Sequence, residues 1–467
     1  MCGVFGIWNH PEAAKLTYLG LHALQHRGQE GAGIVSGDLA ADFFSRHQAR
    51  GLVADVFTEH DLEGLHGPRA IGHARYSTAG GTGPQNVQPF KVDTLRGPLA
   101  IAHNGNLVNV DNLRNDLERE GAIFSTRSDT EILVHLLARA RAPRIEDRVR
   151  EACAQVEGAY TLLIMHRDGL IGVRDPNGYR PLILGQVNGA HVLTSESCAL
   201  ELLGGEFVRE IEPGEMVCLT KDGQMRSERL YHAPEATPQS CIFELVYFAR
   251  PNSRIFEADV YEARRSMGMQ LARESTPDAD LVMPVPDSGV PAALGFSEAS
   301  GLPFRHGLLR SHYVGRTFIE PTQSIRNFGV KLKLSAVRSV VEGQRVVVID
   351  DSIVRGTTSR KIVEIIRNAG AREVHVRISA PPTRFPCFYG INTPTRQELI
   401  AAQKSVSEIA DYLTADSLAY LSEAGLHEAV NDNLGPKRRF CNACFTGEYI
   451  AGRRIIENRL SAPSAAG

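Results

Sequence analysis

RVVVIDDSIVRGTTS, the stretch from Arg345 to Ser359, decides the fold of the second half of this chain. It begins with four apolar residues in a row, 346–349, which predict a buried strand of a parallel sheet. Two adjacent carboxylates, Asp350 and Asp351, come next, and the small and hydroxyl-bearing residues 355–359 follow them. In the segment 360–368, apolar residues then recur at helical spacing, which predicts a helix there. The order of elements is therefore strand, acidic turn, small-residue loop and helix.

This order suits a ligand that carries both a phosphate and a diol. Backbone N–H groups of the loop and of the helix N-terminus converge on one place, which favours a phosphate. The two carboxylates would repel a bare phosphate, but they fit ribose hydroxyls, held directly or through Mg²⁺. The alternative is a plain strand-to-helix turn in which an aspartate caps the helix. The candidate ligand-binding residues are Asp350, Asp351, Arg355, Gly356, Thr357, Thr358 and Ser359.

Length and composition describe an ordinary globular protein. The 467 residues suffice for two or three domains, and 43% apolar and 22% charged residues are typical of globular chains. A net charge of −3 creates no basic field for nucleic acid. No apolar run reaches the roughly 18–20 residues of a membrane span, and the N-terminus lacks the features of a secretory signal. We therefore expect a cytoplasmic protein with neither a nucleic-acid nor a membrane partner.

Cys2 directly follows the initiator methionine. Removal of Met1 before a small residue would give Cys2 a free α-amino group. That amine titrates near pH 8, so the nucleophilic thiol would carry its own base. The start MCG alone does not identify a nucleophile, so the motifs that accompany it have to decide whether Cys2 has this role.

Several motifs of the first half, each readable alone as a turn or a helix cap, occur together with Cys2. They are CGVFGI, HRGQEGAG (His26–Gly33), GHARYST (Gly72–Thr78), HNGNL (His103–Leu107) and SDTE (Ser128–Glu131). In this order they resemble the class II glutamine amidotransferase domain, an N-terminal-nucleophile (Ntn) hydrolase, over residues 2–235. The resemblance implies an αββα sandwich of two antiparallel sheets between helical layers, whereas periodicity alone predicts only α+β.

The same resemblance implies a role for five residues. Cys2 would attack the carboxamide carbon of glutamine, and its amine would move the proton. Asn104 and the Gly105 N–H would form the oxyanion hole, with each donor contributing about 3–4 kcal/mol. Arg75 would hold the α-carboxylate of glutamine, and Asp129 its α-ammonium group.

The second half, residues 236–467, resembles the type I phosphoribosyltransferases, because the stretch 345–359 matches their phosphoribosyl-diphosphate (PRPP) loop. The resemblance implies an α/β domain with a parallel sheet and one Mg²⁺ per subunit, held by Ser288, Asp350 and Asp351. The basic segment 313–333 is expected to close over an anionic ligand, with a solvated loop as the alternative. The residues 231–239 are the candidate linker between the domains.

The two halves in this order resemble the amidophosphoribosyltransferase family. The resemblance implies conversion of PRPP, glutamine and water to 5-phosphoribosylamine, glutamate and pyrophosphate, the first committed step of de novo purine (IMP) biosynthesis. Ammonia would pass between the two sites, the enzyme would be a homotetramer, and purine nucleotides would act as feedback inhibitors at residues that cannot be assigned. Two features depart from the family pattern: Arg310-Ser311-His312 before the YVGRT motif, and Asn252 after ARP.

Two other functions stay open at this point. The second half could be a PRPP- or nucleotide-sensing regulatory module without transfer chemistry, since one fold can serve both purposes. Alternatively, the glutaminase could supply a different acceptor, although the related synthases of that kind lack the loop 350–359.

Eight cysteines include the pair Cys441 and Cys444, which has the chelating spacing C-x₂-C. Cys241 and Cys387 could complete a site of four thiolates, which suits zinc or an iron–sulfur cluster, and the chemistry alone does not choose. The family resemblance implies one structural [4Fe–4S] cluster per subunit on these four residues. The alternatives are buried reduced thiols or a redox-regulated pair. The inert core cysteines are expected to be Cys153, Cys198 and Cys218.

Overall fold

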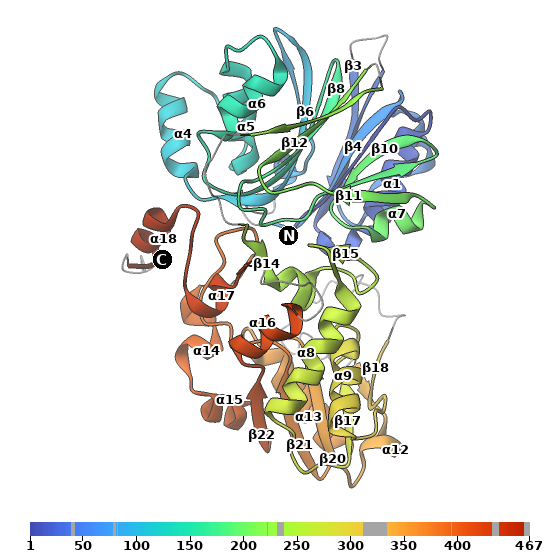
Figure 1. Cartoon of the computed structure of the whole chain (residues 1–467), viewed down its shortest axis with the longest axis vertical. Coiled ribbons are helices and arrows are strands. Elements are labelled where there is room, and N and C mark those ends of the chain that lie inside the picture. Colours follow the sequence, from blue (N-terminus) through green and yellow to red (C-terminus); the bar gives the residue numbers. More distant parts are fainter. Residues whose placement is uncertain are drawn as a thin grey trace.

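The computed structural model consists of two domains stacked along the long axis of the molecule (Figure 1). Both the N-terminus and the C-terminal helix lie near the junction between them. The structure describes residues 1–38, 43–77, 81, 83–221, 223–230, 238–311, 334–393, 395–431 and 439–461. Among these residues, no helix combines the length and the apolar composition that crossing a membrane requires.

Two antiparallel sheets form the centre of the first domain. One sheet has the strand order β11-β9-β10-β1-β4-β2-β3 and the other has the order β13-β12-β8-β7-β6-β5. In the first sheet the strands are β1 (Gly3–Trp8), β2 (Gly31–Asp38), β3 (Phe43–Arg50), β4 (Arg69–Arg75), β9 (Ile183–Val187), β10 (Ala190–Thr194) and β11 (Glu206–Glu210). In the second they are β5 (Phe90–Thr94), β6 (Gly97–Leu107), β7 (Gly158–His166), β8 (Gly169–Arg174), β12 (Glu215–Thr220) and β13 (Met225–Arg229).

Strand β1 shows why this domain has four layers. All six of its residues are buried, because the sheet is covered on both faces. Val4 and Trp8 point into the core between the two sheets, while Phe5 and Ile7 point to the opposite face, which helix α1 covers. The second sheet buries its outer face against α5 and α6. The predicted αββα sandwich is therefore confirmed.

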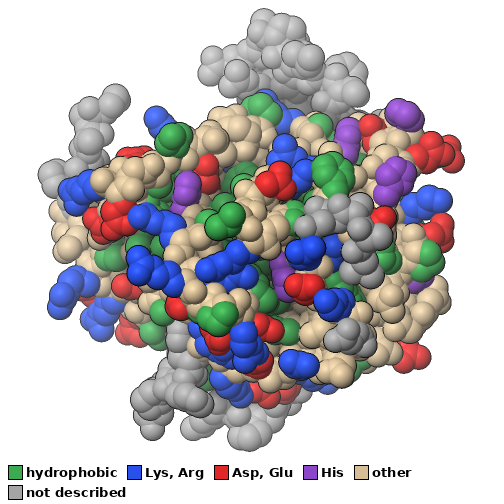
Figure 2. Space-filling model, turned by 90° about the horizontal axis from the view of Figure 1, so that it is seen from above, with side chains coloured by type: hydrophobic (Ala, Val, Ile, Leu, Met, Phe, Trp, Pro, Cys, Tyr) green, Lys and Arg blue, Asp and Glu red, His purple; other side chains and the backbone are tan. Residues whose placement is uncertain are grey.

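The helices of the first domain are short. They are α1 (Ala13–Ala23), α2 (Val53–Val56), α3 (Glu59–Glu63), α4 (Val110–Arg119), α5 (Asp129–Arg139), α6 (Ile145–Cys153) and α7 (Cys198–Leu202), with 3-10 turns η1 (Gln25–Arg27) and η2 (Pro84–Asn86). Ser128 caps α5, as the SDTE motif predicts, because its hydroxyl accepts from the Thr130 N–H at 3.3 Å. On the end of this domain seen in Figure 2, basic and acidic side chains are interspersed, in keeping with the small net charge.

The second domain is built on a four-stranded parallel sheet of order β17-β20-β21-β22. Its strands are β17 (Leu281–Pro284), β20 (Arg345–Asp350), β21 (Glu373–Ile378) and β22 (Ser417–Tyr420). The helices around it are α8 (Val260–Glu274), α9 (Val290–Ser300), α12 (Arg338–Val341), α13 (Thr357–Asn368), α14 (Ile400–Gln403), α15 (Val406–Leu413) and α16 (Glu423–Asn431), with the 3-10 turn η4 (Arg396–Glu398). The predicted parallel sheet is confirmed.

Helix α13 begins earlier than its apolar spacing predicts. Gly356 precedes it with φ +76°, a left-handed conformation that glycine adopts at little cost, and this turn lets the helix start at Thr357. The hydroxyls of residues 357–359 therefore belong to the first helical turn, where N–H groups are unpaired and point away from the helix.

Smaller elements complete the second domain and its junction with the first. They are β14 (Ser240–Cys241), β15 (Arg254–Ile255), β16 (Ala258–Asp259), β18 (Leu308–Arg310), β19 (Leu334–Ala336), β23 (Phe440–Cys441), the π-helix η3 (Glu244–Phe248), α17 (Ala443–Thr446) and α18 (Arg453–Ser461). Ile456 of α18 packs with Val108 and Ala159 of the first domain. Most of the expected linker, 231–237, and the expected closing loop, 313–333, lie outside the described residues.

Candidate active sites at the domain junction

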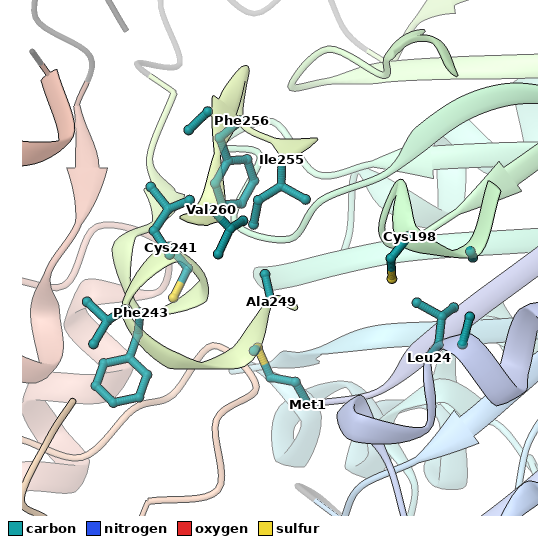
Figure 3. Packing of buried hydrophobic residues seen from close by; sticks show 14 of the residues in the cluster. Met1, Leu24, Cys198, Cys241, Phe243, Ala249, Ile255, Phe256 and Val260 are labelled. Atoms are coloured by element: carbon teal, nitrogen blue, oxygen red, sulfur yellow. The ribbon is translucent and has the colours of Figure 1, made fainter. Parts of the chain in front are cut away.

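Cys2 lies at the start of β1, next to the strand that carries Asn104. The Cys2 N–H donates to Asn104 Oδ1 at 3.1 Å, and the Cys2 thiol donates to the backbone carbonyl of Tyr76 at 3.5 Å. Met1 is buried in front of Cys2, and Figure 3 shows its side chain beside Ala249 of the second domain. After loss of Met1, the α-amine of Cys2 would keep Asn104 Oδ1 as its partner.

The end of β6 carries Asn104 and Gly105, the two residues predicted to form the oxyanion hole. Asn104 is fully buried, and its Nδ2 atom is one of the buried side-chain atoms without a hydrogen-bond partner among the described residues. A buried donor of this kind is costly unless a ligand satisfies it. Gly105 has φ +156°, and a Cβ there would stand 2.0 Å from the Ala159 carbonyl oxygen. Only glycine therefore fits at this position.

Arg75 and Asp129 lie on the other sides of the same site. The Arg75 guanidinium donates to Gly81 O at 2.6 Å and to Ser77 Oγ at 3.3 Å. Burial lowers the pKa of Arg75, while the nearby Cys2, Glu30 and Asp129 act against that shift. The structure thus brings a cation and an anion together around Cys2, as reading a free amino acid requires.

His103 is a residue of this site that the sequence reasoning missed. Its Nδ1 stands 3.6 Å from Asp129 Oδ1 and 3.1 Å from Thr130 Oγ1. Burial disfavours the charge on both His103 and Asp129, but their mutual attraction outweighs it. The pKa of His103 is therefore raised and that of Asp129 is lowered. The motif HNGNL contains this histidine, so the signal was present in the sequence.

A cavity of about 410 Å³ opens at the carboxyl end of β20. It brings together most of the ligand-binding residues predicted for the second half: Ser288, Asp350, Asp351, Arg355, Thr358 and Ser359. Gly356 and Thr357 do not line it. A Cβ on Gly356 would stand 2.8 Å from Ile400 Cδ1, so this glycine allows the turn to pack. The Arg355 guanidinium is directed to Glu398 Oε1, at 2.9 Å.

The paired carboxylates in this cavity are adjacent, with Asp351 buried and Asp350 half-buried. Ser288 Oγ donates to Asp351 Oδ2 at 2.5 Å, and Ser352 Oγ donates to Asp351 Oδ1 at 2.6 Å. Burial raises the pKa of both Asp350 and Asp351, and the charge of Asp351 raises that of Asp350 further. A bound divalent cation would relieve this cost, and Mg²⁺ needs only one or two carboxylates beside water and ligand oxygens. The residues present therefore fit the expected Mg²⁺.

The two departures from the family pattern have partners nearby. Arg310 Nη1 donates to Asp287 Oδ2 at 2.7 Å, so this arginine contacts the turn that also carries Ser288. The Asn252 amide donates to Glu201 Oε2 at 2.8 Å. His312 lies outside the described residues.

The four cysteines of the expected cluster come together from three separate segments. Cys241 on β14 stands opposite Cys441 on β23, and these two short strands pair in parallel. Burial raises the pKa of Cys241 to about 11, while Arg180 acts to lower it. Burial, and then the charges of Cys241, Cys387 and Cys441, raise the pKa of Cys444.

Among the described residues, no group of three or more His, Cys, Asp or Glu side chains is arranged to hold a metal ion. The four thiols are thus gathered in one region but are not positioned as the ligands of a metal ion in this structure.

Tyr76 connects the two candidate sites. Its carbonyl oxygen contacts the Cys2 thiol, and its side chain lines the cavity that contains Asp350 and Asp351. Tyr247 and Phe248 of η3 line the same cavity from the second domain. The two sites thus face each other across the domain junction.

Comparisons with known proteins agree with this arrangement. A family model described as "Glutamine amidotransferase domain" matches residues 73–202. The chain is 53% identical over 451 residues to amidophosphoribosyltransferase 2, chloroplastic, of Arabidopsis thaliana, with 96% of this chain and 79% of that protein covered. It is 50% identical over 454 residues to the amidophosphoribosyltransferase of Bacillus subtilis, with 96% and 94% covered.

Solved structures show the same similarity. Glutamine phosphoribosylpyrophosphate amidotransferase from B. subtilis, complexed with ADP and GMP, superposes with a TM-score of 0.91 at 48% identity. That match covers 97% of this chain and 98% of the other. A structure described as the allosteric regulatory enzyme of purine biosynthesis also matches with a TM-score of 0.91, at 49% identity.

Proposed function

This chain belongs to the amidophosphoribosyltransferase family, and we propose that its two sites divide the reaction of the first step of purine biosynthesis between them. The first domain releases ammonia from glutamine. The second domain joins that ammonia to C1 of PRPP. The products are glutamate, 5-phosphoribosylamine and pyrophosphate.

The glutamine half-reaction starts at Cys2 once Met1 has been removed. The α-amine takes the thiol proton, and the thiolate attacks the carboxamide carbon. Asn104 Nδ2 and the Gly105 N–H hold the oxyanion, Arg75 holds the α-carboxylate, and Asp129 holds the α-ammonium group. The protonated amine returns its proton to the leaving nitrogen, so ammonia departs and a thioester remains. Water then releases glutamate from Cys2.

A single observation carries this assignment: the unpartnered, buried Nδ2 of Asn104 beside Cys2. A buried amide donor without a partner destabilises the protein in the absence of a ligand. Its placement is explained if an oxyanion forms there during the reaction.

The transfer half-reaction takes place in the cavity at the end of β20. Thr358 and Ser359, in the first turn of α13, line this cavity and hold the 5-phosphate, and Asp350 and Asp351 bind the ribose hydroxyls. Mg²⁺, one per subunit, would be held by Ser288, Asp350 and Asp351, and it would neutralise charge on the departing pyrophosphate. Ammonia attacks C1 of the ribose as the bond to pyrophosphate breaks.

The ammonia has to reach C1 without becoming protonated in bulk water. The position of Tyr76, with its backbone at Cys2 and its side chain in the transferase cavity, supports direct passage between the sites. The segment 313–333 would close the transferase site during turnover.

Further features of the family complete the proposal. One structural [4Fe–4S] cluster per subunit would be bound by Cys241, Cys387, Cys441 and Cys444, and it would tie the C-terminal segment to the start of the second domain. The B. subtilis structure contains ADP and GMP, which supports purine nucleotides as inhibitors of this chain. We also propose a homotetramer that works in the cytoplasm.

The test of this proposal measures product formation from Mg²⁺, PRPP and glutamine, and then from Mg²⁺, PRPP and ammonia. Cys2→Ala should abolish the first activity and leave the second. Loss of both activities in a folded variant would contradict the two-site scheme. A protein that binds PRPP without forming any product would instead be a sensor.

A further inference from the structure

Arg27 is a buried cation directly behind the nucleophile. It ends the turn η1, none of its surface is exposed, and its Nε donates to the backbone carbonyl of Cys2 at 3.0 Å. It therefore fixes the peptide group of the residue that carries the thiol. Its position matters for catalysis, because a misplacement of about 1 Å can cost two orders of magnitude in rate.

The carboxylate that accepts two hydrogen bonds from the Arg27 guanidinium comes from the other domain. Glu244, the first residue of η3, accepts from Arg27 Nη2 at 2.8 Å and from Arg27 Nη1 at 3.0 Å. Arg27 and Glu244 therefore form a bidentate ion pair, and both side chains are fully buried. Glu244 is separated from Arg27 by 217 residues along the chain. Glu244 does not line the transferase cavity, although Tyr247 of the same short helix does.

Glu196, the second carboxylate on Arg27, is already shared by other donors. It accepts from Arg27 Nη1 at 2.5 Å, from His26 Nε2 at 2.8 Å, and from the Ser253 hydroxyl at 2.7 Å. Burial and then the attraction of Glu244 are the two largest influences on the pKa of Arg27, which is raised. Glu244 is thus the principal counter-charge of Arg27, although it also accepts from the buried Arg180 Nη1 at 3.5 Å. Removing the charge of Glu244 would leave Arg27 buried with one shared carboxylate.

From this geometry we infer that Glu244 and Arg27 are positioning residues for Cys2, so that the glutaminase site is completed by a carboxylate of the transferase domain. The inference rests on the proposed function. Glu244 holds the guanidinium of Arg27, and this guanidinium holds the Cys2 carbonyl. The Cys2 N–H is held separately by Asn104. The first domain by itself does not contain a fully positioned nucleophile.

The primary test is Glu244→Gln, which keeps the shape of the side chain and removes its charge. We expect the kcat for glutamine-dependent synthesis to fall at least tenfold. The KM for glutamine should change less than threefold, because Arg75 and Asp129 are untouched. Ammonia-dependent synthesis should stay within twofold of the unmodified enzyme, since Glu244 does not line the transferase cavity.

A double variant tests whether Glu244 acts through Arg27. Arg27→Gln should lower the glutamine-dependent kcat at least as much as Glu244→Gln, and the combined variant should be no worse than Arg27→Gln alone. The rate at which iodoacetamide alkylates Cys2, followed on the N-terminal peptide by mass spectrometry, should fall in all three. This readout needs neither glutamine nor PRPP.

The matched control is Glu215→Gln. It removes the charge from another bidentate ion pair, which Glu215 forms with Arg209 away from Cys2. It should keep glutamine-dependent activity. The inference is overturned if Glu244→Gln behaves like this control, if both activities of Glu244→Gln fall in parallel, or if the effects of Glu244 and Arg27 multiply. An unmodified enzyme that makes no product from glutamine and PRPP would instead refute the proposed function.

Discussion

The Cys2 thiol contacts the carbonyl oxygen of Tyr76 at 3.5 Å, and the side chain of the same Tyr76 lines the cavity around Asp350 and Asp351. One residue thus belongs to the walls of both sites. Under the proposed function, ammonia released at Cys2 would emerge beside the residue that faces Asp350 and Asp351. The two half-reactions would thus take place in adjacent sites. Because the sites use different residues, mutations can still separate the two activities.

Replacing the oxyanion-hole amide should damage only the glutamine reaction. Asn104→Ala removes the unpartnered Nδ2 donor, and loss of one such donor costs about 3–4 kcal/mol, or roughly 10²–10³ in kcat. Initial rates with glutamine and with ammonia measure this directly. Asn106→Ala, on the same strand, is the control, and equal loss in both assays would contradict the assignment.

The aspartate pair should be needed for PRPP but not for glutamine hydrolysis. Asp351→Asn removes one charge from the proposed Mg²⁺ site, so we expect the Mg²⁺ concentration for half-maximal ammonia-dependent synthesis to rise by roughly tenfold or more. Hydrolysis of glutamine without PRPP should continue. Asp278→Asn, whose side chain is 88% exposed, should leave both unchanged. An unaltered Mg²⁺ requirement in Asp351→Asn would refute the site.

Gly105 should tolerate no side chain. In Gly105→Ala the new Cβ would stand 2.0 Å from Ala159 O at φ +156°, so we expect a loss of about 2–6 kcal/mol of stability together with loss of glutaminase activity. Gly189→Ala, also at positive φ but with open space around it, should cost only about 1–2 kcal/mol. Thermal unfolding of the two variants compares these costs, and equal midpoints would contradict the steric explanation.

The pair of His103 and Asp129 predicts a defined pH dependence. Because the pKa of His103 is raised in the folded protein, the protonated ring stabilises the fold fully below its unfolded value near 6.5. This contribution disappears as the pH rises through the raised folded value. Asp129 stays ionised in that range, since its pKa is lowered below 3.8.

His103→Gln should therefore lower the unfolding midpoint more at pH 5.5 than at pH 9. His191 provides the opposite control, because burial lowers its pKa. The neutral ring of this half-buried histidine stabilises the fold above pH 6.5 and loses that contribution as the pH falls, so His191→Gln should cost more at pH 9. A pH-independent effect of His103→Gln would show that the pair is not ionic.

The iron–sulfur proposal predicts a composition. Anaerobically purified protein should be brown and contain about four irons and four sulfides per chain. Cys444→Ser should lose most of both, whereas Cys153→Ser, a buried thiol on α6 away from the group, should keep them. If the protein contains one zinc per chain, the four thiols bind zinc rather than a cluster. If metal-free protein is active, the four cysteines are ordinary thiols.

Local patterns in the sequence predicted the strand at 346–349, its parallel sheet and the acid pair, because each follows from a few neighbouring residues. They placed the start of α13 too late, since the left-handed turn at Gly356 is not visible in the apolar spacing. The gathering of Cys241 and Cys441 depends on a pairing of two-residue strands, which no periodicity reveals. Resemblance to a family, rather than spacing, supplied that set.

The network around Arg27 was out of reach of the sequence for a different reason. Arg27 is part of a recognised motif, but its partner Glu244 stands 217 residues away in an apolar segment. A charged residue in such a segment signals a buried pair without naming the partner. His103 was overlooked because its neighbours Asn104 and Gly105 already had an assigned role.

Helix α18, at the end of the described chain, packs against the first domain, so this contact can form only when synthesis is nearly complete. The helix is made last, yet Ile456 packs against Val108 and Ala159, which lie among the first 160 residues, and Arg459 pairs with Asp111 at 2.8 Å. In a nascent chain, the first domain would therefore be complete before α18 covers this surface and before Glu244 reaches Arg27. Wasteful release of ammonia would be restrained until a chain can also use it, and a truncation before residue 453 would expose the same apolar surface for good.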